Sequence, residues 1–183
     1  MNLSYQHLVK KIPSKPSIEE ISDRLFQLGH ENEVNGQIIE IEITPNRGDC
    51  LSLDGILRDL NVFYSIDFDK DIYEDGLKPF SFEFKNLAVK DCSKISFMMI
   101  DIEQTCTNYK GELKDYFNDL KTNKNNFFTD ISNFISYETG QPTHCYDASS
   151  VNELSLEYTD RKQNFETLLD QTIELQEDEL VFK

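Results

Sequence analysis

The stretch from Phe127 to Asp147 constrains the fold more than any other part of the chain. Its first part is apolar enough for a buried helix, and Gly140 stands where such a helix would end. Pro142 fixes the backbone two residues later, so the segment that follows is expected to leave as a loop. The helix carries Asn133 and the loop carries His144. Because loops that follow a rigid helix often carry binding groups, the sequence suggests a pocket lined by these two residues.

Each polar residue of this stretch also has a simpler structural interpretation. A lone histidine is more often a hydrogen-bonded core or turn residue than a binding group. Asn is a poor helix-interior residue, so a buried Asn133 needs a hydrogen-bonding partner, which is either backbone or substrate. Ser132 can bond back to a helix carbonyl, and Asp147 can cap a turn. On the residues alone, a binding pocket and ordinary core packing remain open alternatives.

Residues 1–65 combine helical and strand patterns. Ser17 and Glu20 form a capping-box pattern at the start of an amphipathic helix that extends to residue 28. Residues 39–43 alternate apolar and acidic side chains, as in a half-buried strand. A second amphipathic helix is expected to start at residue 51 and to end near residue 64. Together these patterns predict a small helix-strand-helix unit of the α+β class.

A turn-rich loop over residues 44–50 joins that strand to that helix. Arg47 either contacts phosphate or RNA, or pairs with a neighbouring acid while Asp49 caps the next helix. The structural interpretation is favoured, since the net charge of −16 argues against autonomous nucleic-acid binding. Phosphate contact needs clustered Lys and Arg, and acidic residues interrupt the basic segments of this chain.

The rest of the chain predicts a linker followed by a mixed domain. Residues 66–79 are acidic and turn-like, and residues 80–183 predict a second, mixed sheet-and-helix domain. The elements expected there are helices over 113–120 and 127–139, strands over 80–84, 95–102, 154–158 and 180–183, and a hairpin over 168–175.

The sequence gives no pattern for a membrane span, a metal or a nucleophilic hydrolase. No apolar run reaches the roughly 18–20 residues that span a bilayer, and no signal peptide is visible, so we expect a soluble cytoplasmic protein. The four cysteines lack zinc or redox spacing and are expected to be free thiols: Cys50, Cys92, Cys106 and Cys145. There is no nucleophile elbow and no Gly-rich phosphate loop, and we expect no metal or cofactor on this chain.

Three blocks in consistent order resemble the β subunit of bacterial phenylalanyl-tRNA synthetase. The first resembles the opening folded unit of that family, and the other two resemble its editing domain. The blocks are Ile43–Ser52 running into Gly55–Leu60, then Asp130–Phe134 with Glu138–Asp147, then Thr167–Asp170 with Glu177–Val181.

The resemblance implies hydrolysis of tyrosine mis-attached to the phenylalanine tRNA. Tyrosine differs from phenylalanine by one hydroxyl, which an apolar pocket rejects weakly, so a second site is needed. By resemblance, Asn133 and His144 are the catalytic residues that orient the ester, the terminal ribose and the attacking water. Ser132 and Pro142 line the substrate pocket. The resemblance also implies an α subunit in a heterotetramer, the acceptor end of tRNA(Phe), and ATP with magnesium for the whole enzyme, with neither membrane nor DNA.

The chain also departs from the family pattern. Ser132 stands where the family usually has Thr, and the inserted oligonucleotide-binding barrel is absent. The chain ends before the glutamate and glycine-rich segments that recognise the tyrosine hydroxyl. We therefore expect the N-terminal portion of a β subunit with a partial editing domain that lacks a complete active site. The alternative is a stand-alone, non-catalytic relative that binds a protein partner or a small ligand.

Overall fold

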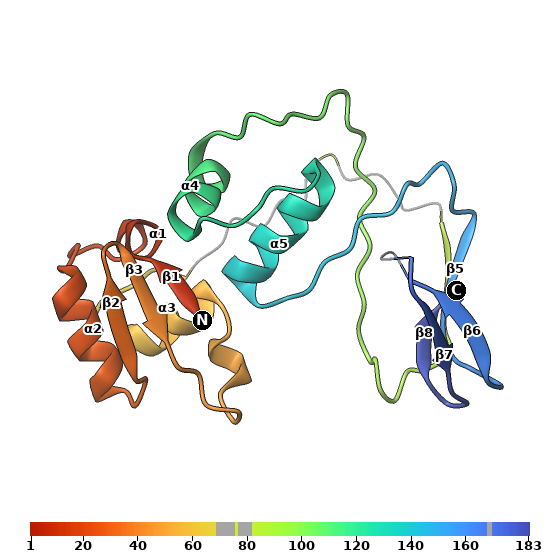
Figure 1. Cartoon of the computed structure of the whole chain (residues 1–183), viewed down its shortest axis with the longest axis horizontal. Coiled ribbons are helices and arrows are strands. Elements are labelled where there is room, and N and C mark those ends of the chain that lie inside the picture. The colour runs from red at the N-terminus through yellow and green to blue at the C-terminus, as the bar shows by residue number, and fades with distance from the viewer. Residues whose placement is uncertain (69–75, 77–81, 168–169) are drawn as a thin grey trace. The chain divides into compact units, whose positions relative to one another are not determined.

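The computed structural model describes residues 1–68, 76, 82–167 and 170–183. Packing divides the chain into two compact units, which alternate along the sequence (Figure 1). The first unit comprises Met1–Ile72 and Glu103–Cys145, and the second comprises Tyr73–Ile102 and Tyr146–Lys183. The division into domains at 1–65 and 80–183 stays a prediction, and most of the predicted linker 66–79 lies outside the described residues.

The first unit is built on a small antiparallel sheet. Its strand order is β1-β3-β2, with bounds Asn2–Ser4 for β1, Ile38–Ile41 for β3 and Asn32–Asn35 for β2. Ile39 and Ile41 of the central strand are buried while Glu40 is exposed, which confirms the predicted half-buried strand. The sequence reading did not identify β1 or β2, because one is very short and the other is polar.

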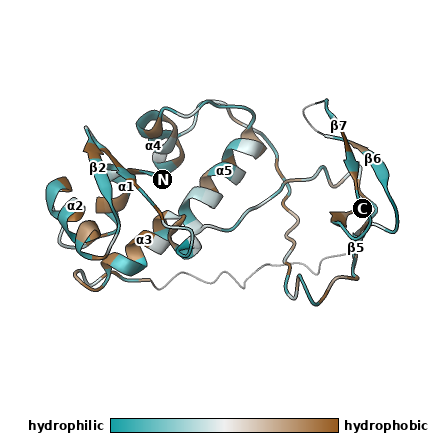
Figure 2. Cartoon of the chain, turned by 60° about the horizontal axis from the view of Figure 1, so that its bottom comes forward, coloured by the Kyte–Doolittle hydropathy of each residue, from teal (hydrophilic) through white to brown (hydrophobic). Residues whose placement is uncertain are grey.

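Helices cover this sheet and close the core of the first unit. The helices are α1 (Tyr5–Lys10), α2 (Ile18–Gln27) and α3 (Leu53–Leu60). The Ser17 hydroxyl accepts a hydrogen bond from the Glu20 backbone N–H at 3.2 Å, so the predicted N-cap of α2 is confirmed. The Glu20 carboxylate accepts from the Tyr64 hydroxyl at 3.1 Å. Hydrophilic and hydrophobic residues alternate along α2 and α3 (Figure 2), as expected for helices buried on one side.

Two further helices complete the first unit, and both were predicted. They are α4 (Gly111–Leu120), which lies beside α1 and β1, and α5 (Phe127–Thr139), which lies beside α3 and α4 (Figure 1). The buried ring of His7 on α1 lies 6.3 Å from the Phe134 ring and 6.2 Å from the Tyr137 ring of α5. The expectation that α5 is buried is wrong, because only one side of it packs on its neighbours and most of its residues are half-buried or exposed.

The buried residue of α5 is an acid, Asp130. Its carboxylate accepts a hydrogen bond from the Tyr109 hydroxyl at 2.6 Å and another from the Asn125 backbone N–H at 2.9 Å. These partners compensate for removing the carboxylate from water. Asp130 therefore fixes both the start of α5 and the chain segment before α4.

Three tyrosine hydroxyls of the first unit are expected to titrate late. Burial raises the pKa of Tyr64, Tyr109 and Tyr137 to about 12, from an ordinary value of 10.0. A raised pKa in the folded state stabilises the fold fully below about pH 10, and this stabilisation is lost as the pH rises to about 12. We expect tyrosinate absorbance to rise in two stages, with the later stage accompanying loss of helical circular dichroism. Full ionisation near pH 10 with the fold intact would contradict this.

The second unit contains a mixed sheet and a separate hairpin. The sheet order is β4-β5-β8. The central strand β5 (Glu153–Tyr158) pairs in parallel with β4 (Glu83–Asn86) and antiparallel with β8 (Leu180–Phe182). The hairpin pairs β6 (Gln163–Glu166) with β7 (Thr172–Leu175). The strands predicted over 154–158 and 180–183 are confirmed, and with the helices of the first unit they confirm the α+β class.

One strand prediction for the second unit is wrong, and two others differ from the structure in their bounds. Residues 95–102 form no strand, and Met98 and Ile100 are 73% and 64% exposed. Residues 97–100 are continuously apolar without alternation, and no strand of the described residues pairs with them. The hairpin begins at Gln163 rather than 168, and Leu168 and Leu169 lie outside the described residues. The strand predicted over 80–84 begins at Glu83, and residues 80 and 81 are also outside.

Among the helices that the structure describes, none has the length and apolar character needed to cross a bilayer.

Candidate functional site

Helix α5 carries the first two predicted site residues. Asn126 caps the helix, since its side-chain oxygen accepts from the backbone N–H groups of Phe128 at 3.1 Å and Thr129 at 3.0 Å. Gly140 ends it with φ +75°, a left-handed conformation that glycine adopts without steric cost. Between these ends, Ser132 is half-buried and Asn133 is exposed. Asn133 is therefore not the buried helix-interior residue that we expected, because it lies on the solvent side of α5.

The segment after Gly140 turns back along α5 (Figure 1). The Ser136 hydroxyl donates to the Gln141 carbonyl at 3.2 Å, and the Ser132 hydroxyl lies 3.6 Å from the Cys145 sulfur. That sulfur also lies 4.0 Å from the Phe128 carbonyl oxygen. Because residues 128, 132 and 136 are four apart, they lie on one side of the helix. Residues 141–145 therefore run antiparallel along this side of α5.

We call Ser132, Asn133 and residues 141–145 the α5 wall. The Ser132 side chain contacts the Cys145 side chain. Asn133 follows Ser132 in the sequence, and His144 precedes Cys145, so both predicted catalytic residues flank this contact. Pro142 and His144 are exposed, as is Asn133. The α5 wall thus presents a carboxamide and an imidazole to solvent from a helix and from the segment folded back on it.

Two residues of the α5 wall were missed in the sequence. Cys145 makes the contact with Ser132 that holds the returning segment. Thr143 has a buried side-chain oxygen that has no hydrogen-bond partner among the described residues. Such an atom calls for an unseen partner, such as water or a ligand group. No sequence pattern predicted the Cys145 contact or the buried Thr143 oxygen, because both depend on how residues 141–145 fold back along α5.

Asp147, in the second unit, caps a turn, as its structural interpretation predicted. Its carboxylate accepts hydrogen bonds from the Ser149 backbone N–H at 3.0 Å and from the Ser149 hydroxyl at 2.7 Å. These bonds lower the pKa of Asp147. The residue therefore caps a turn.

The structural interpretation of Arg47 is confirmed. Its guanidinium contacts the Asp49 carboxylate at 3.1 Å and the Asp59 carboxylate at 2.5 Å. The hydrogen bond from Arg47 lowers the pKa of Asp49 to about 2. Asp49 does not cap α3, however, because it lies in the short 3₁₀ helix η1 (Gly48–Cys50) and binds arginine. Ser52 is the cap, and it accepts from the Gly55 backbone N–H at 3.0 Å.

A cluster of metal-binding residue types lies beside Arg47. His30, Cys50 and Asp59 each offer one ligand atom, and these atoms all lie within 4.8 Å of one another. The His30 Nε2 atom is 3.0 Å from the Asp59 carboxylate. Burial, followed by the nearby Asp59 charge, raises the pKa of the Cys50 thiol to about 11. Sequence spacing did not reveal this cluster, because its members come from three different segments.

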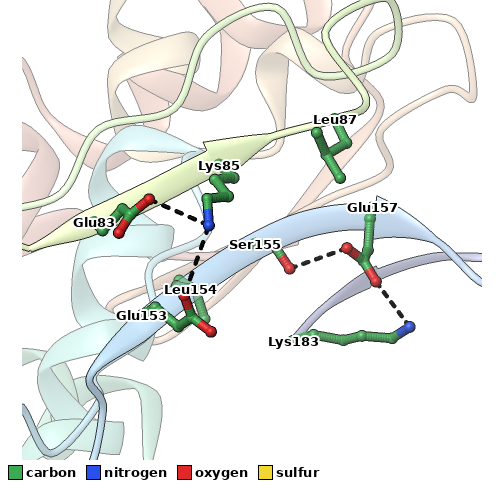
Figure 3. A pocket seen from close by; sticks show the side chains of 8 residues that line it. All are labelled: Glu83, Lys85, Leu87, Glu153, Leu154, Ser155, Glu157 and Lys183. Atoms are coloured by element: carbon green, nitrogen blue, oxygen red, sulfur yellow. Dashed lines mark hydrogen bonds and ion pairs between the residues drawn. The ribbon is translucent and has the colours of Figure 1, made fainter.

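A hollow of about 280 Å³ lies in the second unit, along the β4–β5–β8 sheet (Figure 3). Its charged side chains pair with one another: Lys85 with Glu83 at 3.2 Å and with Glu153 at 3.7 Å, and Lys183 with Glu157 at 2.8 Å. The ammonium groups that could attract an anionic ligand already have carboxylate partners. The hollow therefore adds no residue to the candidate site.

Comparison with known proteins places the chain in a family. Residues 96–183 match the model of the B3/4 domain. The chain is 30% identical over 158 residues to the phenylalanine–tRNA ligase β subunit of Psychrobacter arcticus, covering 81% of this chain and 19% of that protein. It is 32% identical over 126 residues to the β subunit of Aquifex aeolicus, covering 66% of this chain and 16% of that protein.

The β subunit of Francisella tularensis is similar at 27% identity over 154 residues, which is 76% of this chain and 18% of that protein. The chain thus spans about a fifth of the length of these curated relatives. These matches cover most of the chain. The chain belongs to the phenylalanine–tRNA ligase β-subunit family and includes a match to its B3/4 domain.

Proposed function

We propose that this chain is the N-terminal portion of a phenylalanine–tRNA ligase β subunit and supplies one wall of a hydrolytic editing site. The substrate of that site is tyrosine esterified to tRNA(Phe). The observation that carries this proposal is the contact between Ser132 and Cys145 at 3.6 Å. This contact holds residues 141–145 against α5, so that the two parts of one family block, Asp130–Phe134 and Glu138–Asp147, contribute to one surface.

The exposed polar groups of the α5 wall suit contact with the end of a tRNA. Asn133 can donate and accept hydrogen bonds, and His144 can do both when neutral. We assign them to the ester, the terminal ribose and the attacking water. Ser132 and Pro142 line the substrate side, and the unpartnered Thr143 oxygen offers a further hydrogen bond. A water held by such groups adds to the ester carbonyl, the acyl–oxygen bond to the ribose breaks, and a proton of the water passes to the departing ribose oxygen, which releases tyrosine and tRNA(Phe).

The editing role answers a selectivity problem of the ligase. An apolar pocket that accepts phenylalanine rejects the added hydroxyl of tyrosine only weakly, so errors must be removed after attachment. A site for this purpose needs a second wall that recognises the tyrosine hydroxyl. We assign no described residue to that second wall, so we expect residues 1–183 alone to leave Tyr-tRNA(Phe) intact.

The same proposal includes partners and cofactors of the whole ligase. The α subunit joins the β subunit in a heterotetramer. In that assembly the acceptor end of tRNA(Phe) reaches the α5 wall. The assembly works in the cytoplasm. Since the net charge of the chain is −16, most phosphate contacts must come from other parts of the ligase. ATP and magnesium serve aminoacylation in the whole enzyme, and we assign neither to this chain.

Co-expression with the α subunit of the same organism tests this assignment. We expect the α subunit to co-purify with the chain, and the isolated chain to leave Tyr-tRNA(Phe) intact. Rapid deacylation by the isolated chain that His144→Ala does not alter would sink the assignment of the α5 wall.

A second candidate function is a non-catalytic binding module for a protein or a small ligand. The exposure of Asn133, Pro142 and His144 favours it, because catalytic groups usually line a sheltered pocket. Recovery of an unrelated partner in the same co-expression experiment, without the α subunit, decides for the binding module.

A further inference from the structure

Three metal-binding side chains converge in the first unit, on elements other than the α5 wall. His30 lies three residues after the end of α2, Cys50 ends η1, and Asp59 lies in the last turn of α3. Among the residues that the structure describes, they are the group whose ligand atoms gather within 4.8 Å of one another. His30 and Cys50 are buried, and the Asp59 side chain is 15% exposed. The cluster is thus sheltered and open to solvent on the Asp59 side.

The distances within the cluster are close to those of a tetrahedral metal site. The Asp59 Oδ2 atom lies 3.0 Å from His30 Nε2 and 3.5 Å from Cys50 Sγ. Zinc binds nitrogen and oxygen at about 2.0–2.2 Å and sulfur at about 2.3 Å, so neighbouring tetrahedral ligands lie about 3.3–3.6 Å apart. Small side-chain movements would therefore suffice to bring the three donor atoms onto one ion.

A cation already contacts two of the three donor atoms. The Arg47 Nη2 atom lies 2.5 Å from Asp59 Oδ2 and 2.8 Å from Cys50 Sγ. Asp59 and Cys50 therefore already face a positive charge. The Arg47 side chain is 31% exposed and belongs to a loop, and its Nε donates to Asp49 at 3.1 Å. An ion bound by all three donors requires this guanidinium to move outward.

We propose that His30, Cys50 and Asp59 bind a Zn²⁺ ion that replaces the Arg47 guanidinium. One imidazole, one thiolate and one carboxylate form a donor set that zinc favours, and a water completes the tetrahedron. The Cys50 thiol releases its proton to solvent as the sulfur–zinc bond forms, and His30 binds through the Nε2 lone pair. No oxidation state changes. The ion joins the end of α2, η1 and α3, so it stabilises the first unit without taking part in editing.

Cobalt(II) absorption tests the site on a protein that contains Cys50 as its one cysteine. The other three are exposed or half-buried, so the combined change Cys92→Ser, Cys106→Ser and Cys145→Ser is expected to leave the core around Cys50 intact, and a serine at position 145 keeps a hydroxyl that can bond to Ser132. We expect one equivalent of Co²⁺ to produce a thiolate-to-cobalt band that Zn²⁺ abolishes. The same protein with Cys50→Ser is expected to give no band. Absence of the band in the folded Cys50 protein overturns the proposal.

The Arg47→Ala change gives a second readout that does not depend on replacing a ligand. Because the guanidinium competes with the ion for Asp59 and Cys50, its removal is expected to tighten Zn²⁺ binding about tenfold or more. Zn²⁺ is also expected to raise the midpoint of thermal unfolding of the unmodified chain by a few degrees. Zinc binding that is unchanged or weaker in folded Arg47→Ala protein contradicts the proposed position of the ion.

Discussion

Gly55→Ala is expected to destabilise the first unit by about 3 kcal/mol, which is a large fraction of the stability of a small domain. A Cβ atom at position 55 would lie 2.1 Å from the Asp49 carbonyl oxygen and 3.0 Å from the Cys50 Cα atom. These are backbone atoms, so η1 would have to move away from α3. This movement would also separate Arg47 from Asp59. Urea unfolding followed by circular dichroism measures the change.

Helix propensity predicts the opposite sign for Gly55→Ala, which makes the measurement decisive. In an open helix position, alanine stabilises by roughly 0.5–1 kcal/mol relative to glycine. Gly48→Ala is the matched control, because a Cβ atom at position 48 meets no atom within 4 Å. We expect this control to change the free energy of unfolding by less than about 0.5 kcal/mol. Equal effects at both positions would show that η1 does not press on α3.

His144→Ala is expected to slow hydrolysis of Tyr-tRNA(Phe) about a hundredfold in a β subunit that is complete on both sides of the editing site. The recipient is a bacterial ligase that edits, in which residues 127–147 of this chain replace the matching residues. The imidazole is assigned to positioning the water and the terminal ribose, so its loss removes both contacts. Single-turnover deacylation of preformed Tyr-tRNA(Phe) measures the rate.

Gln141→Ala in the same hybrid ligase is the control for His144→Ala. Gln141 is exposed in the same segment, and its backbone N–H and carbonyl make the hydrogen bonds that shape the turn. These backbone contacts survive the change, so deacylation is expected to stay within about twofold of the parent hybrid. If both substitutions slow the reaction equally, the segment acts through its conformation and His144 has no specific role.

Elements whose signals are local could be predicted from the sequence. Ser17 caps α2 as expected, and Gly140 ends α5 as expected, because cap and stop residues act on their own helix ends. The alternation around Ile39 and Ile41 also identified β3, since a half-buried strand shows a period of two.

Elements that depend on distant partners could not be predicted in this way. Residues 95–102 have the composition of a strand, but a strand needs a neighbour, and no described strand pairs with them. Asp49 looked like a helix cap, but in the folded chain its carboxylate binds Arg47 and Arg58. The partnership of His30 with Asp59 joins residues that are 29 apart in sequence. Only the folding of the first unit brings them together.

In the candidate site, too, local features could be predicted and contacts between distant residues could not. Family motifs pointed to Ser132, Asn133, Pro142 and His144, but they gave no burial for any of these residues. Asn133 drew attention as a polar residue in an apolar helix, yet it faces solvent because one side of α5 packs and the other does not. The return of residues 141–145 along α5 depends on two features. Gly140 was predicted to end the helix, whereas the Cys145 contact with Ser132 was not predicted from the sequence.

The central claim is that α5 and the segment folded back on it form one wall of a tyrosine-editing site. Its most direct test is the hybrid ligase with residues 127–147 of this chain and no further change. We expect this hybrid ligase to deacylate Tyr-tRNA(Phe) at a rate near that of the recipient and to leave Phe-tRNA(Phe) intact. Accumulation of Tyr-tRNA(Phe), as in a recipient without its B3/4 domain, would contradict the claim if the hybrid still folds and aminoacylates normally.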